Sequence, residues 1–187
     1  IARAFLTSEA TMQQRIVRAK KALAEAHVPF EVPRGPERQE RLASVLEVIY
    51  LIFNEGYAAT SGDDWMRPAL CEDALRLGRI LAELMPHESE VHGLTALMEI
   101  QASRMAARTN PQGEPIPLLE QDRGRWDPML IQRGLAALER AEGLGQLGPY
   151  TLQAAIAACH ARARAAEDTD WARIAALYDA LSQIAPS

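Results

Sequence analysis

The sequence predicts an all-α fold. Apolar residues recur at spacings of three and four along most of the 187 residues, which is the period of an amphipathic helix. Hardly any segment alternates apolar and polar residues as a half-buried strand does. Prolines, glycines and capping residues separate the periodic segments, so each segment has a recognisable start and stop. Short connections between helices of this length favour antiparallel helix pairs.

The first segment reads as the end of a helix-turn-helix. Ser8 is a good N-cap, because its hydroxyl can accept a hydrogen bond from a free backbone N–H of the following turn, so a helix should begin at Glu9. Residues 1–7 have the spacing of a short bracing helix and a turn. The second helix carries one apolar stripe, formed by Met12, Ile16, Ala19 and Leu23.

Charge is distributed unevenly along the chain. Residues 1–23 hold five basic residues and one acidic residue, whereas the chain as a whole has a net charge of −5. A basic segment in an otherwise acidic chain suits contact with phosphates, because the electrostatic attraction of a nucleic acid depends on the local field more than on the net charge of the protein. The alternative is a single amphipathic helix whose basic side is merely solvated.

A proline-rich segment at 28–36 divides the chain. Three prolines and a glycine within nine residues exclude a helix and favour a stiff, extended connector. We therefore expect three parts, 1–27, 28–36 and 37–187. A loop inside a single domain is the alternative.

The remainder is expected to be helical to the end. A stripe at Leu42, Val45, Leu46, Ile49 and Phe53 predicts one helix, with Gly56 as the C′ residue that stops it. Asp127-Pro128 and Asp170 are further helix starts. After the helix that contains Leu42 and Phe53, we expect further helices at 67–85, 88–108, 127–142, 149–166 and 170–184. An irregular stretch is expected at 115–126.

Two spacings favour a tetratricopeptide-like array. Ala74 precedes Pro86 by about a dozen residues, and Tyr178, Leu181 and Pro186 have the spacing expected at the end of another unit. A full 34-residue period is not visible, so the repeats are degenerate. Such units stack because no single helix pair can bury its apolar face alone.

The run from Ile1 to Lys20 resembles the end of region 4, the promoter-reading domain of bacterial extracytoplasmic-function sigma factors. Strings at 50–57, 90–98, 118–127 and 148–158 are similar to the long tetratricopeptide-like C-terminal extension of one subgroup of these factors. The resemblance implies that the helix starting at Glu9 enters the major groove at the −35 element. The residues implied to contact DNA are Ser8, Glu9, Thr11, Gln14, Arg15, Arg18 and Lys20.

The same resemblance implies what surrounds the chain. Because it begins with Ile and inside a motif, we expect it to be part of a longer protein that also carries the first part of region 4 and the polymerase-binding region 2. Promoter DNA and the RNA polymerase core are then partners of the full-length protein. The extension would modulate sigma activity through intramolecular or partner-protein contacts.

Two clusters are candidates for those protein contacts. The first ends a strongly hydrophobic helix and comprises Asn54, Glu55 and Tyr57. The second lies in the irregular stretch and comprises Asp122, Arg123, Arg125 and Trp126. Loops that carry arginines, carboxylates and an indole are more often functional than loops of small polar residues. The alternative is an internal salt-bridged clamp between repeats.

The sequence contains few features that would indicate other classes of function. Cys71 and Cys159 lie in apolar segments, so we expect them to be buried structural thiols. His87 and His92 are five residues apart and lie on different faces of a helix, so we expect no metal or other cofactor. The sequence contains none of the common phosphate-loop, nucleophile or metalloprotease motifs, so we do not expect an enzyme. No apolar run is long enough to cross a bilayer, which leads us to expect a cytoplasmic protein without a membrane partner.

Two main hypotheses remain. The first is the C-terminal part of a transcription initiation factor, with promoter recognition by the first helix. The second is a helical-repeat scaffold for protein assembly, without DNA binding, in which residues 1–26 are only a capping helix. A third, an all-α hydrolase, would need clustered acid and base groups that the sequence does not reveal.

Overall fold

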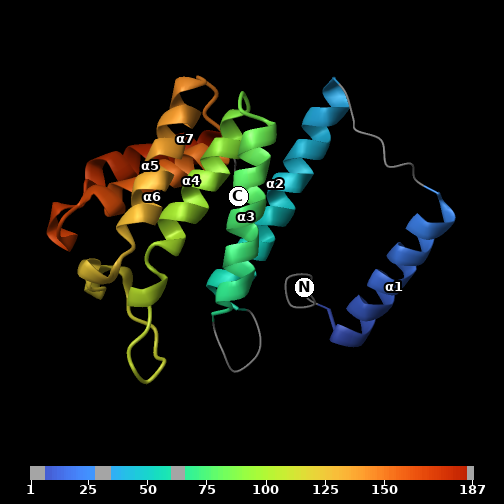
Figure 1. Cartoon of the computed structure of the whole chain (residues 1–187), viewed down its shortest axis with the longest axis horizontal. Helices are drawn as coiled ribbons and strands as arrows, with labels where there is room; N and C mark the ends of the chain where they lie inside the picture. The colour runs from blue at the N-terminus through green and yellow to red at the C-terminus, as the bar shows by residue number, and fades with distance from the viewer. Residues whose placement is uncertain (1–6, 28–34, 60–65, 185–187) are drawn as a thin grey trace. The chain divides into compact units, whose positions relative to one another are not determined.

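A computed structural model describes residues 7–27, 35–59 and 66–184 of the chain (Figure 1). The expected all-α class is confirmed, because these residues form seven α-helices and four short 3₁₀ turns and contain no strand. One isolated bridge, between Thr109 and Pro115, closes a loop. The chain divides into two compact units, Ile1–Ser44 and Val45–Ser187.

The first unit contains helix α1 (Glu9–Glu25) and the beginning of α2 (Pro36–Tyr57). The predicted start of α1 is confirmed, since the Ser8 hydroxyl accepts a hydrogen bond from the backbone N–H of Thr11 at 3.2 Å. Pro36, the last residue of the predicted connector, is the first residue of α2, a position where proline is favoured. The bracing helix expected before Thr7 and residues 28–34 of the connector lie outside the described residues.

The stripe predicted along α2 is largely buried. Leu42, Leu46, Ile49 and Phe53 are each at most 9% exposed, whereas Val45 is 43% exposed. The helix continues through Gly56 to Tyr57, so the expectation that Gly56 is the C′ residue is wrong. A Cβ on Gly56 would lie 2.7 Å from the backbone nitrogen of Cys71. Gly56 is therefore a point of close contact between two helices and not a helix stop.

Three of the five later helices match the expected ranges to within one residue at each end, whereas the helix expected at 149–166 ends at Arg162. Asp127 caps α5 by accepting hydrogen bonds from Met129 and Leu130, and Asp170 caps α7 by accepting one from Arg173. The helices are α3 (Pro68–Leu84), α4 (Ser89–Ala102), α5 (Pro128–Gly143), α6 (Pro149–Arg162) and α7 (Trp171–Ile184).

Helix α4 ends earlier than expected, because the chain turns at Ser103. The Ser103 hydroxyl donates to the carbonyl of Ile100 at 2.7 Å, and its own carbonyl accepts a hydrogen bond from the backbone N–H of Asp127 at 2.8 Å. A 3₁₀ turn, Met105–Ala107, follows. This bend brings the end of α4 to the irregular stretch before α5.

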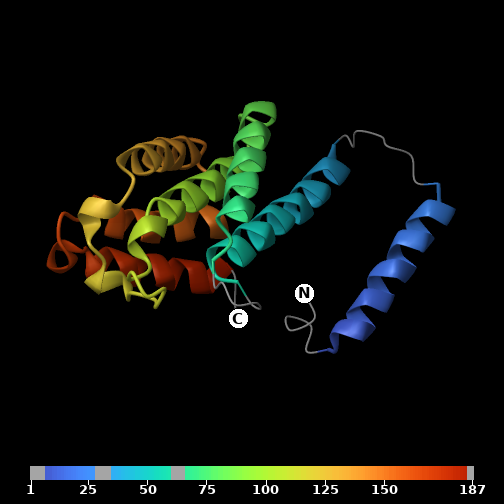
Figure 2. The same ribbon diagram turned by 60° about the horizontal axis from the view of Figure 1, so that its bottom comes forward.

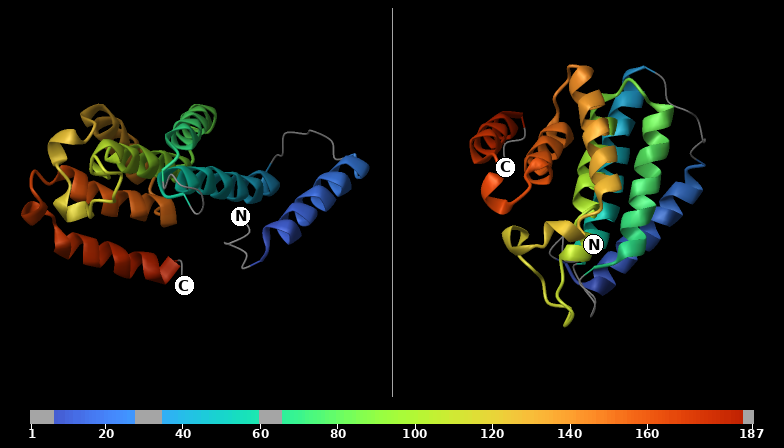
Figure 3. Two further views of the ribbon diagram at one scale, coloured as in Figure 1. Left: turned by 90° about the horizontal axis from the view of Figure 1, so that it is seen from below. Right: turned by 60° about the vertical axis from the view of Figure 1, so that its left-hand side comes forward.

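Helix α4 is the centre of the second unit. It packs against α3, α5 and α6, which can be followed from further sides in Figures 2 and 3. Twelve of its fourteen residues are buried, so polar residues such as Thr95 and Glu99 lie inside the unit as well. A Cβ on Gly93 would lie 2.7 Å from the backbone nitrogen of Thr151, so the absence of a side chain permits the close approach of α6.

The interior between α4, α5 and α6 is rich in alanine, which allows backbones to approach closely. Its core comprises Ala96, Leu97, Ile100, Ala137, Leu138, Ala154, Ala155, Ala157 and Ala158. A smaller cluster of Ile156, Cys159 and Ile174 joins α6 to α7. Helix α4 thus packs on both α5 and α6, and α6 packs on α7.

Among the described helices, none combines the length and the apolar character needed to span a bilayer.

Candidate functional site

Helix α1 carries the residues that the resemblance to region 4 implies as DNA contacts. All of them are exposed, namely Ser8, Glu9, Thr11, Gln14, Arg15, Arg18 and Lys20. Ser8 and Thr11 are also joined to each other, because their hydroxyl oxygens lie 2.8 Å apart in the cap. The start of the helix is therefore ordered by two of the candidate contacts themselves.

The apolar side of α1 is only partly covered. Met12 is buried at 8% exposure, whereas Ile16 and Leu23 are 37% and 63% exposed. Of the predicted apolar stripe, only Met12 is therefore buried. The described residues of this unit do not cover the rest of the stripe.

Tyr57, a predicted contact residue at the end of α2, is held by two arginines from the segment after α4. The Arg108 guanidinium lies over the Tyr57 ring, 3.4 Å from its centroid, and donates to the Tyr57 carbonyl. Arg104 donates to the Tyr57 hydroxyl at 2.9 Å. The ring also stacks on Phe53, with centroids 5.5 Å apart. Tyr57 therefore joins α2 to the segment that follows α4.

The other two residues predicted beside Tyr57 have different surroundings. Glu55 forms an ion pair with Arg67 at 3.1 Å, which spans the connection between α2 and α3. The carbonyl of Asn54 accepts a hydrogen bond from the backbone N–H of Ala58 at 2.8 Å, which continues the helical pattern. Neither Asn54 nor Glu55 is fully buried.

The second predicted cluster is divided between the interior and the surface. Trp126 is 5% exposed, and the Arg123 guanidinium lies 4.7 Å from its ring centroid. Arg123 also donates to the carbonyls of His160 and Ala163, so it binds carbonyls at the C-terminal end of α6. Asp122 and Arg125 are exposed, and Asp122 accepts a hydrogen bond from the backbone N–H of Gly124.

Arg104 joins the two predicted clusters. Its guanidinium carbon lies 6.0 Å from the Tyr57 ring centroid and 5.9 Å from that of Trp126. We call the resulting group the arginine–aromatic cluster; it comprises Tyr57, Arg104, Arg108, Arg123 and Trp126. Sequence reasoning missed Arg104 and Arg108. No local pattern in the sequence distinguishes these two arginines from exposed ones, because their burial depends on Tyr57 and Trp126, which lie far away in the chain.

The arginine–aromatic cluster concentrates positive charge in a poorly solvated place. Burial is the main cause that lowers the pKa of Arg104, Arg108 and Arg123, and for Arg104 the neighbouring Arg123 lowers it further. Several donors near the cluster have no partner among the described residues, namely Arg104 Nε, Arg123 Nη2 and Trp126 Nε1. Buried charges and donors of this kind are normally paired.

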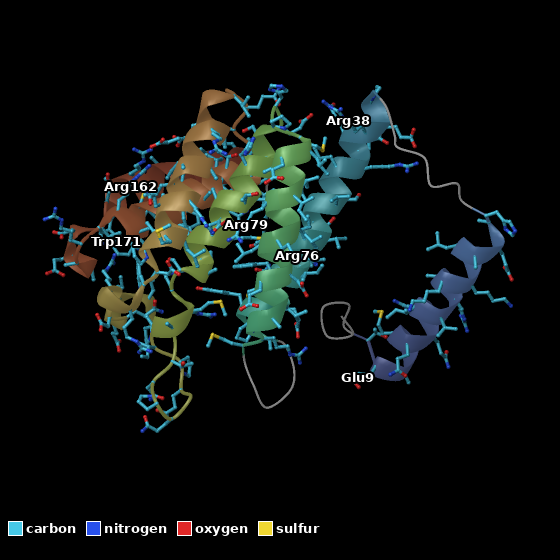
Figure 4. The ribbon with its side chains drawn as sticks, in the orientation of Figure 1. Glu9, Arg38, Arg76, Arg79, Arg162 and Trp171 are labelled. Atoms are coloured by element: carbon cyan, nitrogen blue, oxygen red, sulfur yellow. The ribbon has the colours of Figure 1, made fainter. Side chains whose placement is uncertain are left out.

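A separate groove of about 760 Å³ lies along α3, α4 and α5. Glu99 forms part of it and is 2% exposed; its Oε1 accepts a hydrogen bond from Arg79 Nε at 2.7 Å (Figure 4 labels Arg79). This bond raises the pKa of Arg79. Arg133 and Arg140 line the groove from α5.

The described residues hold no group of three or more histidine, cysteine, aspartate or glutamate side chains that could bind a metal. His92 is buried and pairs with the carbonyl of Pro86 at 2.9 Å. Cys71 and Cys159 are buried free thiols, as the sequence predicts.

Comparisons with known proteins place these features in a family. Residues 41–142 match the model of a family of unknown function, DUF6596. An uncharacterized protein of Rhizobium meliloti (strain 1021) is 50% identical over all 187 residues. The chain spans 44% of the length of that relative. No solved structure matches the chain significantly. The match covers more than half of the chain, including most of α2, all of α3 and α4, most of α5 and the whole arginine–aromatic cluster, so the chain belongs to the DUF6596 family.

Proposed function

We propose that the full-length protein is a transcription initiation factor of the extracytoplasmic-function sigma type. In this proposal, α1 is the helix that reads the −35 element, and the unit from Val45 onward is a regulatory extension. The observation that carries the proposal is the first helix itself: a Ser8-capped helix whose exposed side carries Arg15, Arg18 and Lys20. The resemblance to region 4 of the sigma factors adds to it.

The chemistry of α1 suits a phosphate backbone. Arg15 and Arg18 are three residues apart and so lie on one side of the helix. The helix N-terminus at Glu9 adds a partial positive charge and free backbone N–H groups that favour phosphate oxygens. Gln14 is a residue type that can read a base edge, because its amide can donate to and accept from adenine.

The extension would act through its surface near the arginine–aromatic cluster. Arg123 and Trp126 hold the loop before α5 against α6, and Asp122 and Arg125 project from the same loop to the surface. A rigidly held loop with exposed charges is a suitable contact for the RNA polymerase core or for the sigma domains. We therefore assign the protein contact to Asp122 and Arg125, and the positioning of the loop to Arg123 and Trp126.

Salt dependence of promoter binding tests the role of α1. The full-length protein is assembled with core RNA polymerase, and its affinity for a promoter duplex is measured over a range of salt concentrations. The variant R15Q/R18Q should weaken binding and reduce the slope of log affinity against log salt by about 0.9 for each phosphate that is no longer neutralised. The matched control is R76Q on α3, which removes an exposed arginine far along the chain. An unchanged slope in R15Q/R18Q would exclude phosphate contact by α1.

The second candidate function is a protein-assembly scaffold, and the groove along α3, α4 and α5 favours it. Stacked helix pairs typically bind partners in a concave face of this kind. A scaffold without DNA binding predicts no promoter-specific complex in the experiment above, whatever the salt concentration.

A further inference from the structure

A second cavity, of about 260 Å³, lies between α4, α6 and α7. Its walls are mainly apolar and include Leu97 from α4 and Ile156 and Ala157 from α6, each at most 9% exposed. Arg104 and His160 also line it. Small-molecule sites combine apolar walls with a few convergent polar groups, and a cavity of this volume suits a ligand of few atoms.

Arg104 is a buried cation with no counter-ion among the described residues. It is 9% exposed, and its Nη2 donates to two neutral acceptors, the hydroxyl of Tyr57 and the side-chain oxygen of Gln101. Among the described residues, Arg104 forms no ion pair with a carboxylate, and its Nε has no hydrogen-bond partner. A charge removed from water in this way normally has a partner of opposite sign, because desolvation is otherwise uncompensated.

His160 supplies a second group with unused hydrogen-bonding capacity. Its Nδ1 is buried and has no hydrogen bond to the described residues, while its ring lies in a T-shaped contact with that of Trp171, with centroids 5.5 Å apart. Burial, Arg104 and Arg123 together lower the pKa of His160, so the ring is neutral at pH 7. A neutral imidazole can donate one hydrogen bond.

We propose that this cavity binds a small monocarboxylate with an apolar tail. Arg104 pairs with the carboxylate, His160 supplies one further hydrogen bond, and Leu97, Ile156 and Ala157 enclose the tail. One guanidinium matches one negative charge, and Arg123, which would be needed for a more highly charged phosphate, does not line the cavity. The proposal concerns only the second unit and is independent of DNA binding by α1.

The site is connected to the surface that we assign to protein contact. Arg104 contacts Tyr57 at the end of α2 and lies over Trp126 in the loop before α5. Neutralising its charge would alter the balance of contacts inside the arginine–aromatic cluster. Occupancy of the cavity is therefore placed to affect the loop that presents Asp122 and Arg125.

Calorimetry and thermal melting of the full 187-residue chain test the proposal. The probes are acetate, hexanoate and benzoate, which share the carboxylate and differ in the tail, together with 1-hexanol and inorganic phosphate. We expect hexanoate or benzoate to bind and to raise the melting temperature. Acetate, 1-hexanol and phosphate should each bind at least about tenfold more weakly, because each lacks the tail or the single charge.

Three variants locate the site. R104M should lose carboxylate binding by at least about tenfold while keeping its helical circular dichroism, since an apolar residue of similar length replaces an unpaired buried charge. A157L should do the same by filling the cavity, with Arg104 intact. R76M, on the exposed side of α3, should bind as the wild type does. The proposal is overturned if no carboxylate binds the wild type, if 1-hexanol or phosphate binds as tightly as hexanoate, or if both R104M and A157L bind normally.

Discussion

The carboxylate of Glu90 on α4 binds Thr151 at the beginning of α6. It accepts hydrogen bonds from the Thr151 hydroxyl at 2.6 Å and from the backbone N–H groups of Thr151 and Tyr150 at 3.0 and 2.8 Å. The neighbouring Ser89 hydroxyl lies 3.0 Å from the carbonyl of Ala141 near the end of α5. The first turn of α4 therefore caps the start of one helix and contacts the end of another.

Replacing Glu90 by alanine should destabilise the second unit. The change leaves two backbone donors and a hydroxyl at the start of α6 without an acceptor and removes a negative charge from a helix N-terminus. We expect a loss of about 2 kcal/mol in the free energy of unfolding, measured by urea denaturation. E139A, an exposed change on α5, is the control and should alter stability by less than about 0.5 kcal/mol. Equal effects of the two changes would show that the cap contributes nothing.

Gly56 and Gly143 should respond in opposite ways to alanine. A Cβ on Gly56 would lie 2.7 Å from the nitrogen and 2.8 Å from the Sγ of Cys71, so G56A must push two helices apart and should cost about 2 kcal/mol or more. Gly143 ends α5, has nothing within 4 Å of an added Cβ and is not in a left-handed conformation. G143A should be neutral or stabilising by up to about 1 kcal/mol. Thermal melting of both variants decides the matter, and a harmless G56A would contradict the packing of α2 on α3.

Cys71 should be protected from thiol reagents in the folded chain. Burial raises the pKa of its thiol from 9.0 to about 11, which lowers the thiolate fraction at pH 8 by about a hundredfold. Labelling of C159S, in which Cys71 is the remaining cysteine, should be at least that much slower in buffer than in denaturant. Because the folded pKa exceeds the unfolded one, the associated stability is present below pH 9 and is lost as the pH rises through about 11. Rapid labelling of native C159S would show that the site is open.

His160 should make the chain less stable in mild acid. Its pKa is lowered in the folded state by burial and by two arginines, so below pH 6.5 the unfolded chain takes up a proton that the folded chain does not. Stability therefore rises with pH through this range and is lost as the pH falls below the unfolded pKa. The difference in unfolding free energy between wild type and H160Q, measured from pH 7.5 to 5.0, should shift in favour of H160Q on acidification. A constant difference would mean that His160 titrates as it does in water.

Local signals in the sequence accounted for most of the helix starts. Ser8, Asp127 and Asp170 cap helices at the predicted positions, because a cap depends only on the next three residues. Long-range contacts were not predictable in this way. The role of Gly56 depends on Cys71, which belongs to the next helix, and the early end of α4 depends on a hydrogen bond between Ser103 and Asp127.

The same limit applies to the candidate sites: single residues could be predicted from the sequence, but the contacts between them could not. Tyr57 and Trp126 stood out in the sequence as aromatic residues beside charges, but nothing local links them. Arg104 links them in space, and an arginine that follows a buried helix has no sequence pattern that distinguishes it from an exposed one. The residues of α1 were identified by resemblance, and their accessibility agrees with that prediction, whereas their contact with DNA remains a prediction.

The central claim is that α1 reads a promoter, and initiation by the full-length protein with core RNA polymerase tests it most directly. Transcripts from the promoter that the wild-type protein uses are compared for R15E/R18E and for the control R76E. The account predicts that R15E/R18E lowers promoter-specific transcripts by at least about tenfold while R76E does not, because reversed charges on α1 repel the phosphates. Transcription by R15E/R18E at the wild-type level would contradict it.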